Sequence, residues 1–402
     1  MEKKKVLFYN GQLFMGGIER VATSYINELA KLDSIDLTVL IKENNPEKNI
    51  FVEQISKKVS LKFIKTQKMV SFRDKVAKKK KSIIWKIVYA YLLSYERYYM
   101  KKWLKSLNDE DKYDIIIDFD MSLGKYIQVL DGYKFGWIHY SLIGKKKQKN
   151  KSKRFEKRLE KYDKIITICD EMKDEAKKFY NIPNKKIERL YNPFNIEMIK
   201  TQDLSQLSLF DQKLLEKDYM VAVSRLVKVK GRMDLIEIYY NLKLKYKIKE
   251  KLYILGNGEQ KEQLEEKIKE LHLEEDILLL GEKINPYIWM KRAKVFLHTS
   301  YGEGLPTVFL ESMILGTPVI AYDCPTGPKD ILGNNRYGIL VECGNKTEFE
   351  NAVVKFLNDS SLGIEFLNRF KKEKLDEFLS KNIISKLEYM FNEKRSYYEN
   401  ND

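Results

Sequence analysis

The chain has 402 residues, of which 44% are hydrophobic, and a formal net charge of +16. This length predicts two domains, and the apolar content is sufficient for sizeable cores. The three cysteines, at positions 169, 324 and 343, show neither Cys-x-x-Cys spacing nor a nearby histidine pair. This pattern argues against a zinc site and against a disulfide framework, and it favours the reducing cytosol.

Neither terminal nor internal hydrophobic segments predict membrane insertion. The start, MEKKKVLFYNGQ, has only four apolar residues after its basic residues, fewer than a secretory signal needs. The most hydrophobic segment, IIWKIVYAYLLSYE, is interrupted by Lys86 and is too short to span a bilayer. We therefore expect a soluble cytoplasmic protein.

In the first half, short apolar runs alternate with amphipathic stretches, as in α/β units with a parallel sheet. The segment 16–32 has a helical period. Strands are expected over residues 5–10, 36–41, 59–64, 113–119, 135–140 and 164–169.

A second series of the same kind begins after residue 215. Each half therefore predicts its own Rossmann-like, doubly wound parallel sheet, with domains over 1–195 and 216–360 and a linker over 196–215. The remaining stretch, 361–402, is expected to be helical and could pack on either half, including back on the N-terminal domain. Strands of the second series are expected over 219–224, 251–256, 276–281, 295–300, 318–323 and 338–343.

Ligands of doubly wound domains bind at the carboxyl ends of strands, so the loops after strands are the candidate sites. Gly16 and Gly17 follow the first strand and precede a helix whose free N–H groups suit an anion, although they also fit a plain turn. Arg225 and Lys230 follow strand 219–224, where two cations suit a diphosphate; a solvated basic loop is the alternative. Gly256 opens a Gly-x-Gly that lacks the rest of a dinucleotide fingerprint.

The segment SYGEGLPTVFLES, residues 300–312, joins a strand to a helix. Pro306 fits the first helical turn, and Gly316 suits the helix end. The carboxylate of Glu311, two turns into the helix, can accept hydrogen bonds from ribose hydroxyls, and Glu303 at the loop tip can do the same for a sugar ring. The free amides of residues 304–308, which include Gly304, Leu305 and Thr307, are expected to face the ligand, beside Ser300.

Two further polar features lie at strand ends in the first half. Asp118 and Asp120 form an Asp-x-Asp, which is a weak metal signal, and a strand end with one aspartate turned outward is the favoured interpretation. His139 ends the strand 135–140; such a histidine is usually a hydrogen-bonded core residue, but its strand-end position favours a ligand-facing side chain.

Several motifs together resemble the retaining family-4 glycosyltransferases of the GT-B fold. They are GGIER (16–20), SRLVKVKG (224–231), SYGEGLPTVFLESMILGTPVIAYD (300–323) and CPTGPKDIL (324–332). The similarity is strong over about 219–343 and weak over 45–190. It implies two Rossmann-like domains facing each other across a cleft, with acceptor recognition in the first and nucleotide-sugar binding in the second.

The resemblance also implies roles for individual residues. Glu311 would bind the ribose and Glu303 the donor sugar, while Arg225 and Lys230 would bind the diphosphate. On the first domain, Gly17 would approach the diphosphate and His139 the donor sugar. The segment 284–286, with Asn285, would receive the base.

The implied activity is transfer of a hexose or N-acetylhexosamine, with retention and without a metal or other cofactor. The donor would be a nucleotide-diphosphate sugar, with CPTGP favouring UDP, and the acceptor a glycan or lipid-linked glycan of a bacterial surface polysaccharide or glycoconjugate. A UDP-sugar epimerase on the same scaffold is an alternative, distinguished by turnover without acceptor. A basic nucleic-acid-binding protein is a second alternative, but no nucleic-acid module is recognisable, so we expect no nucleic-acid partner.

The positive charge is clustered at 78–81 and 145–154, which favours a patch over uniform compositional drift. Within 76–105, apolar and aromatic residues such as Ile84, Ile87 and Tyr91 follow a helical spacing beside a lysine run. This pattern predicts either a helix packed on the N-terminal sheet or a basic, aromatic surface on an anionic membrane. The second possibility would place the protein peripherally on the inner face of the cytoplasmic membrane.

Overall fold

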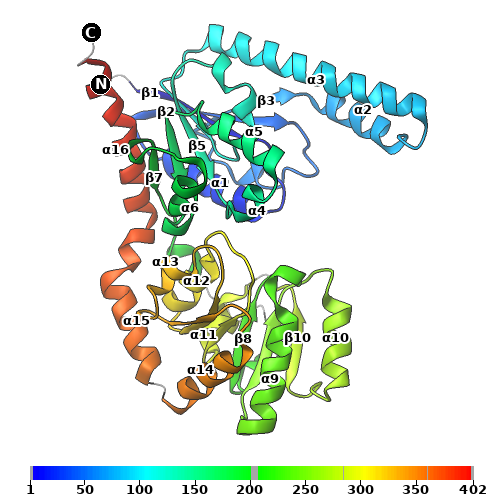
Figure 1. Ribbon diagram of the computed structural model, residues 1–402, viewed down its shortest axis with the longest axis vertical. Helices are drawn as coiled ribbons and strands as arrows, with labels where there is room; N and C mark the ends of the chain where they lie inside the picture. The colour runs from blue at the N-terminus through cyan, green and yellow to red at the C-terminus, as the bar shows by residue number, and fades with distance from the viewer. Residues whose placement is uncertain (1–2, 201–206, 284, 360, 400–402) are drawn as a thin grey trace. The chain divides into compact units, whose positions relative to one another are not determined.

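The expected strands form two separate parallel sheets, as Figure 1 shows. The computed structural model describes residues 3–200, 207–283, 285–359 and 361–399. Its residues group into two units. The first comprises residues 1–168, 173–193 and 380–402, and the second comprises residues 169–172 and 194–379.

The first unit has a seven-stranded sheet in the order β3-β2-β1-β4-β5-β6-β7, with every neighbouring pair parallel. This order reverses direction between β1 and β4, which is the doubly wound arrangement. Five consecutive residues of β1 are buried, as expected for a strand that is covered on both faces. The strands are β1 (Lys4–Asn10), β2 (Ile35–Glu43), β3 (Ser60–Lys65), β4 (Ile115–Asp118), β5 (Tyr133–Ile138), β6 (Lys164–Thr167) and β7 (Ile187–Arg189).

The second unit has a six-stranded parallel sheet in the order β10-β9-β8-β11-β12-β13, with its reversal between β8 and β11. Its core is built from the buried apolar residues of these strands and of the helices that cover them. The strands are β8 (Tyr219–Val223), β9 (Lys251–Leu255), β10 (Ile277–Gly281), β11 (Phe296–His298), β12 (Val319–Asp323) and β13 (Ile339–Glu342).

Helices alternate with the strands in both units, and α1 lies within the predicted helical segment 16–32. Before the C-terminal segment, the α-helices of the first unit are α1 (Gly17–Leu29), α2 (Gln67–Lys78), α3 (Ile83–Glu110), α4 (Ile143–Lys146), α5 (Lys149–Leu159) and α6 (Asp170–Tyr180), of which residues 170–172 group with the second unit. Those of the second are α7 (Glu197–Lys200), α8 (Leu209–Leu215), α9 (Arg232–Tyr246), α10 (Lys261–Glu270), α11 (Tyr287–Arg292), α12 (Thr307–Ile314), α13 (Pro328–Leu332), α14 (Lys346–Asn358) and α15 (Ser361–Glu373).

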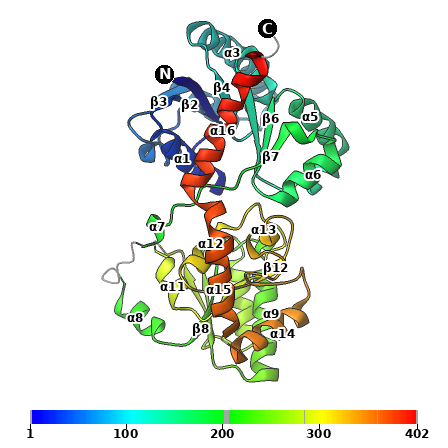
Figure 2. The same cartoon turned by 90° about the vertical axis from the view of Figure 1, so that its left-hand side faces the viewer.

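The last segment divides between the units. Helix α15 belongs to the second unit, whereas α16 (Ser380–Glu399) belongs to the first, and Figure 2 shows each on its own unit. In the first unit, the Lys4 ammonium donates to the carbonyl oxygen of Phe391 at 2.8 Å.

The boundary between the units falls after Pro193 rather than at the expected linker over 196–215. The described part of that linker carries α7 and α8 and groups with the second unit; its residues 201–206 lie outside the described residues.

Candidate functional site

The candidate site lies where β8 and β11 are neighbours, at the reversal point of the second sheet. Ligands of open α/β sheets bind beyond the carboxyl ends of the strands at such a point. Beyond β8 the chain continues through Ser224 and Arg225 to α9, and beyond β11 it continues through residues 299–306 to α12. The sequence-predicted residues Arg225, Lys230, Glu303 and Glu311 are therefore carried by the loops and helices that follow these two strands.

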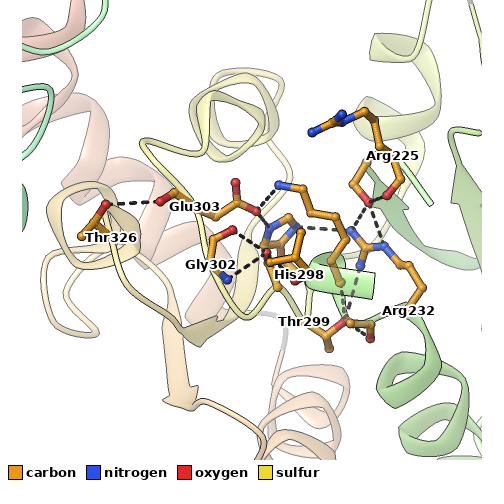
Figure 3. A network of polar contacts seen from close by, with 12 residues as sticks. Arg225, Arg232, His298, Thr299, Gly302, Glu303 and Thr326 are labelled. Atoms are coloured by element: carbon orange, nitrogen blue, oxygen red, sulfur yellow. Dashed lines mark hydrogen bonds and ion pairs between the residues drawn. The ribbon is translucent and has the colours of Figure 1, made fainter. Parts of the chain in front are cut away.

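Glu303 is the centre of a polar network, shown in Figure 3. Its Oε1 accepts hydrogen bonds from Lys230 Nζ at 2.6 Å and from His298 Nε2 at 2.7 Å. The side chain is only 10% exposed, and that of Lys230 is 16% exposed. Its other oxygen, Oε2, accepts no hydrogen bond from the described residues and is not buried from solvent. Glu303 thus keeps one oxygen available to a ligand hydroxyl.

The network keeps Glu303 ionised. Burial acts to raise its pKa and is the largest single influence, but the hydrogen bond from His298 and the charge and hydrogen bond of Lys230 outweigh it. The pKa of Glu303 falls to about 2 as a result. Hydrogen bonds and a positive charge that favour the ionised form of a carboxyl group lower its pKa in this way.

The sequence did not identify His298 and Arg232 as site residues. His298 contacts Glu303 directly, and Arg232 contacts His298. The guanidinium of Arg232 is completely buried and donates to Ser224 Oγ from Nε at 3.0 Å and from Nη2 at 2.8 Å. Its Nη2 also lies 3.5 Å from His298 Nδ1. Polar residues at the end of the apolar strand 295–300 and directly after Gly231 were the available signal.

The protonation of His298 follows from these contacts. Burial lowers the pKa of His298 to about 4, against the influence of Glu303, so the ring is neutral at pH 7. A neutral ring with its proton on Nε2 donates to Glu303 and accepts at Nδ1 from Arg232, which satisfies both contacts. Burial also lowers the pKa of Arg232, to about 10, and leaves it cationic.

The loops that carry Lys230 and Glu303 approach each other closely. Gly231 has φ +61°, and a Cβ there would lie 2.0 Å from the Thr299 carbonyl oxygen, so glycine is required at the start of α9. Thr299 Oγ1 donates to the Gly231 carbonyl oxygen at 2.8 Å. Ser300 is buried, and its hydroxyl lies within hydrogen-bond distance of the carbonyl oxygens of Val229 and Gly302. Ser300 therefore braces the loop in this structure.

The start of α12 presents unpaired backbone donors. The N–H groups of Gly304, Leu305, Thr307 and Val308 donate to no described residue. Leu305 and Pro306 are buried, whereas Gly304 and Thr307 are half-buried. Opposite them, Thr326 Oγ1 lies 3.2 Å from the Gly304 carbonyl oxygen and holds the loop. These amides, together with the helix dipole, form a site that favours an anion.

The other predicted residues of the second unit lie around this network. Arg225 is exposed, and its guanidinium forms no hydrogen bond or ion pair with the described residues (Figure 3). Glu311 is half-buried on α12. Gly256 has φ +133° and would place a Cβ 1.8 Å from the Ser224 carbonyl oxygen. Asn285 lies two residues before α11, and its Oδ1 accepts from Tyr287 N at 3.1 Å. Ile284 of the same motif lies outside the described residues.

The predicted residues of the first unit are Gly16, Gly17 and His139. Gly16 precedes α1, and a Cβ on Gly17 would meet open space. His139 directly follows β5 and is buried, and its Nε2 lies 2.7 Å from the Phe119 carbonyl oxygen. Burial lowers the pKa of His139 to about 4, which leaves its ring neutral at pH 7.

The two aspartates of the Asp-x-Asp accept hydrogen bonds from residues of the first unit. Asp118 is completely buried and accepts from the Tyr162 hydroxyl at 2.5 Å, and burial raises its pKa well above the ordinary range. Asp120 accepts from the backbone N–H groups of Gly11 and Ser122. Across the described part of the chain, no group of three or more His, Cys, Asp or Glu side chains is arranged to hold a metal ion.

Two glycosyltransferase family models match the chain. The model for glycosyl transferases group 1 covers residues 208–376, and that for glycosyltransferase family 4 covers residues 15–198. The first match includes the Glu303 network, and the second covers most of the first sheet.

Two of the curated relatives are bacterial glycosyltransferases. One is the N-acetylgalactosamine-N,N'-diacetylbacillosaminyl-diphospho-undecaprenol 4-alpha-N-acetylgalactosaminyltransferase of Campylobacter jejuni, 34% identical over 48% of this chain and 50% of that protein. Another is the poly(ribitol-phosphate) alpha-N-acetylglucosaminyltransferase of Staphylococcus aureus, 28% identical over 42% of this chain and 34% of that protein. The chain spans at most about half the length of these curated relatives.

Solved structures share the fold over nearly the whole chain. The Anabaena protein HepE, in complex with UDP and glucose, has a TM-score of 0.74 and 16% identity over 97% of this chain and all of that one. A sucrose-phosphate synthase from Thermosynechococcus elongatus has a TM-score of 0.73 and 14% identity over 98% of this chain and all of that one. The prediction of a GT-B fold built from two Rossmann-like domains is confirmed.

Proposed function

We propose that this chain, which belongs to the family-4 glycosyltransferases of the GT-B fold, transfers a sugar from a UDP-sugar to a glycan or lipid-linked glycan acceptor. The observation that carries this proposal is the Glu303 site. It combines an ionised carboxylate with one available oxygen, an adjacent lysine and four unpaired backbone amides. The names of the bacterial relatives support a role in surface polysaccharide or glycoconjugate synthesis with a hexose or N-acetylhexosamine as the transferred sugar.

The proposed donor occupies this site through three kinds of contact. Glu311 accepts from the ribose hydroxyls, and Glu303 Oε2 accepts from hydroxyls of the donor sugar. Arg225, Lys230 and the amides at the start of α12 bind the diphosphate. Asn285 and Gly256 lie in neighbouring loops that would line the nucleotide. Gly16, Gly17 and His139 are proposed donor contacts contributed by the first unit.

The chemical step follows from where charge develops. The anomeric C–O bond to the diphosphate breaks, and its electron pair moves to the phosphate oxygen. Lys230, Arg225 and the α12 amides stabilise the growing negative charge, which is where preorganised donors contribute most. The acceptor hydroxyl attacks the anomeric carbon from the same face and passes its proton to the departing phosphate, which gives retention.

We further propose that turnover requires no divalent metal, because these cations and amides supply the positive potential at the leaving group. Turnover should be unchanged in EDTA. A loss of turnover in EDTA that Mg²⁺ or Mn²⁺ restores would contradict this proposal.

A cytoplasmic location at the inner face of the membrane is proposed as well, and three unpaired cysteines support a reducing compartment.

Calorimetry of Glu311→Gln and Glu303→Gln with UDP and with a panel of UDP-sugars tests the assignment. Loss of a charge-assisted hydrogen bond costs roughly 1.5–3 kcal/mol, which corresponds to about tenfold to a hundredfold in affinity. Glu311→Gln should weaken both ligands by this factor, whereas Glu303→Gln should weaken only the UDP-sugar and reduce transfer more than binding. Glu262→Gln, on the exposed face of α10, is the matched control.

Equal losses of UDP affinity in the two variants would refute separate roles for the two glutamates. Product analysis without acceptor distinguishes the epimerase alternative, because an epimerase converts the UDP-sugar to its isomer and needs no acceptor. Binding of no UDP-sugar from the panel would refute the proposed donor class.

A further inference from the structure

The first half of α3 carries an exposed apolar stripe. Its members recur every three or four residues along the helix, so they share one side of it. The exposed fractions are 67% for Ile84, 68% for Ile87, 71% for Tyr91, 48% for Tyr95 and 65% for Tyr98. Isolated exposed apolar residues are ordinary, but a row of five on one helix side indicates an interaction surface.

This stripe is left uncovered because α3 is anchored elsewhere. The second half of the helix buries Met100, Leu104 and Leu107 in the first unit. The first half packs against α2, and the resulting hairpin extends away from the sheet of its unit in Figure 1. The expected helix over 76–105 is thus two helices, and only the second half of α3 packs as a core helix.

Positive charge surrounds the stripe. Residues 67–105 contain twelve Lys or Arg and two acidic residues. Both acidic residues are already paired, Asp74 with Arg73 and Glu96 with Lys65. Apart from Arg73, the basic residues of this segment form no ion pair with any described residue. Lys79 and Lys80, in the hairpin turn, lie over the rings of Trp85 and Tyr89 at 4.6 Å and 4.1 Å.

We propose that the α2–α3 hairpin, residues 67–105, docks on an anionic lipid leaflet. Its aliphatic and tyrosine stripe would lie at the boundary between headgroups and acyl chains, where aromatic side chains are favoured, and its lysines would face the anionic headgroups. A second copy of the chain is a poor occupant, because two such faces would bring like charges together. Within the described residues, no helix is both long and apolar enough to cross a membrane.

The inference rests on the proposed function in one respect: docking on the membrane would bring the enzyme to a lipid-linked acceptor. Vesicle binding is therefore measured without donor or acceptor, and failure to bind vesicles is distinguishable from failure to bind UDP-sugars. The probes are vesicles of phosphatidylcholine alone and of phosphatidylcholine mixed with phosphatidylglycerol, assayed by flotation over a range of salt concentrations.

Two hairpin variants separate the charge from the stripe. Lys78, Lys79, Lys80 and Lys81 are replaced together by Gln, and in a second variant Ile84, Ile87 and Tyr91 are replaced together by Ser. All seven positions are exposed, so both variants should fold. The charge control replaces Lys57, Lys58, Lys371 and Lys372 by Gln, and the apolar control replaces the exposed Leu244 and Ile364 by Ser.

We expect binding to the mixed vesicles and little binding to phosphatidylcholine alone. One lysine near an anionic leaflet contributes roughly fivefold in partitioning, so the lysine variant should lose at least about a hundredfold at low salt. The stripe variant should lose at least about tenfold at every salt concentration, and the controls should bind like the natural chain. Equal binding to both vesicle types, or unchanged binding of both hairpin variants, overturns the proposal. So does binding of duplex DNA or RNA through the same lysines when the vesicles are not bound.

Discussion

Glu303→Gln provides a direct measure of how strongly the Lys230–Glu303–His298 contacts stabilise the second unit. The change keeps the size of the side chain but removes the charge that faces Lys230 and His298. The contacts lower the pKa of Glu303 from its ordinary value of 4.5 to about 2. One pKa unit corresponds to about 1.4 kcal/mol, so these contacts contribute roughly 3 kcal/mol to folding. Solvent screening reduces this little, because the side chain is 10% exposed.

The pH dependence of this contribution has a definite sign. A carboxylate whose folded pKa is lowered stabilises the protein fully above its unfolded pKa, and the contribution is lost as pH falls through the folded pKa. At pH 7, Glu303→Gln should therefore reduce the free energy of unfolding of the second unit by about 3 kcal/mol. Between about pH 4.5 and pH 2, the difference from the natural chain should shrink by about 1.4 kcal/mol for each pH unit.

The assay is urea unfolding followed by pulsed hydrogen exchange on peptides from β8 and β11, which isolates the second unit. The control is Glu262→Gln on α10, whose side chain forms no ion pair with the described residues. A difference that is as large at about pH 3 as at pH 7 would show that altered packing, and not the charge of Glu303, is responsible. A difference below about 0.5 kcal/mol at pH 7, the range of ordinary surface substitutions, would also refute the reasoning.

Three further outcomes are expected. Arg225→Ala should lower turnover at least about tenfold while changing the free energy of unfolding by less than about 0.5 kcal/mol, because its guanidinium is exposed and has no partner in the described chain; single-turnover kinetics and urea unfolding measure the two effects. Gly231→Ala should destabilise the protein by more than about 1 kcal/mol beyond Gly281→Ala, since both positions have positive φ but only the first would place a Cβ against the Thr299 carbonyl oxygen. The ¹⁵N shifts of His298 should show a neutral ring from pH 8 to about pH 5, because its pKa is lowered to about 4; titration near pH 6.5 would contradict the buried network.

The strands of both sheets were predictable because a strand buried on both faces is a continuous apolar run. All twelve predicted segments overlap strands of the structure. The missed strand, β7, has three residues, Ile187–Arg189, with only its isoleucine buried, so it leaves no run to detect. Its place at the sheet edge comes from pairing with β6, which is a contact between distant segments.

The loops of the candidate site were predictable in part. Glycines, cations and acids after strands identify positions near the carboxyl edge of a sheet, and the structure places Lys230 and Glu303 there in contact. His298 and Arg232 were missed because a histidine in an apolar run and an arginine at a helix start have no distinctive pattern. Their role appears only when β8 and β11 become neighbours and bring side chains 66 positions apart within 3.5 Å.

The α2–α3 hairpin separates most clearly what each level decides. The amino-acid sequence by itself determined that residues 76–105 have a helical spacing, with Ile84, Ile87 and Tyr91 on one side and lysines around them. It left open whether that side would be buried, because periodicity defines a shared face but not its partner. Only the tertiary structure decided this: packing of α2 and of the first sheet covers the other side of the helix and its second half, and the stripe stays in solvent.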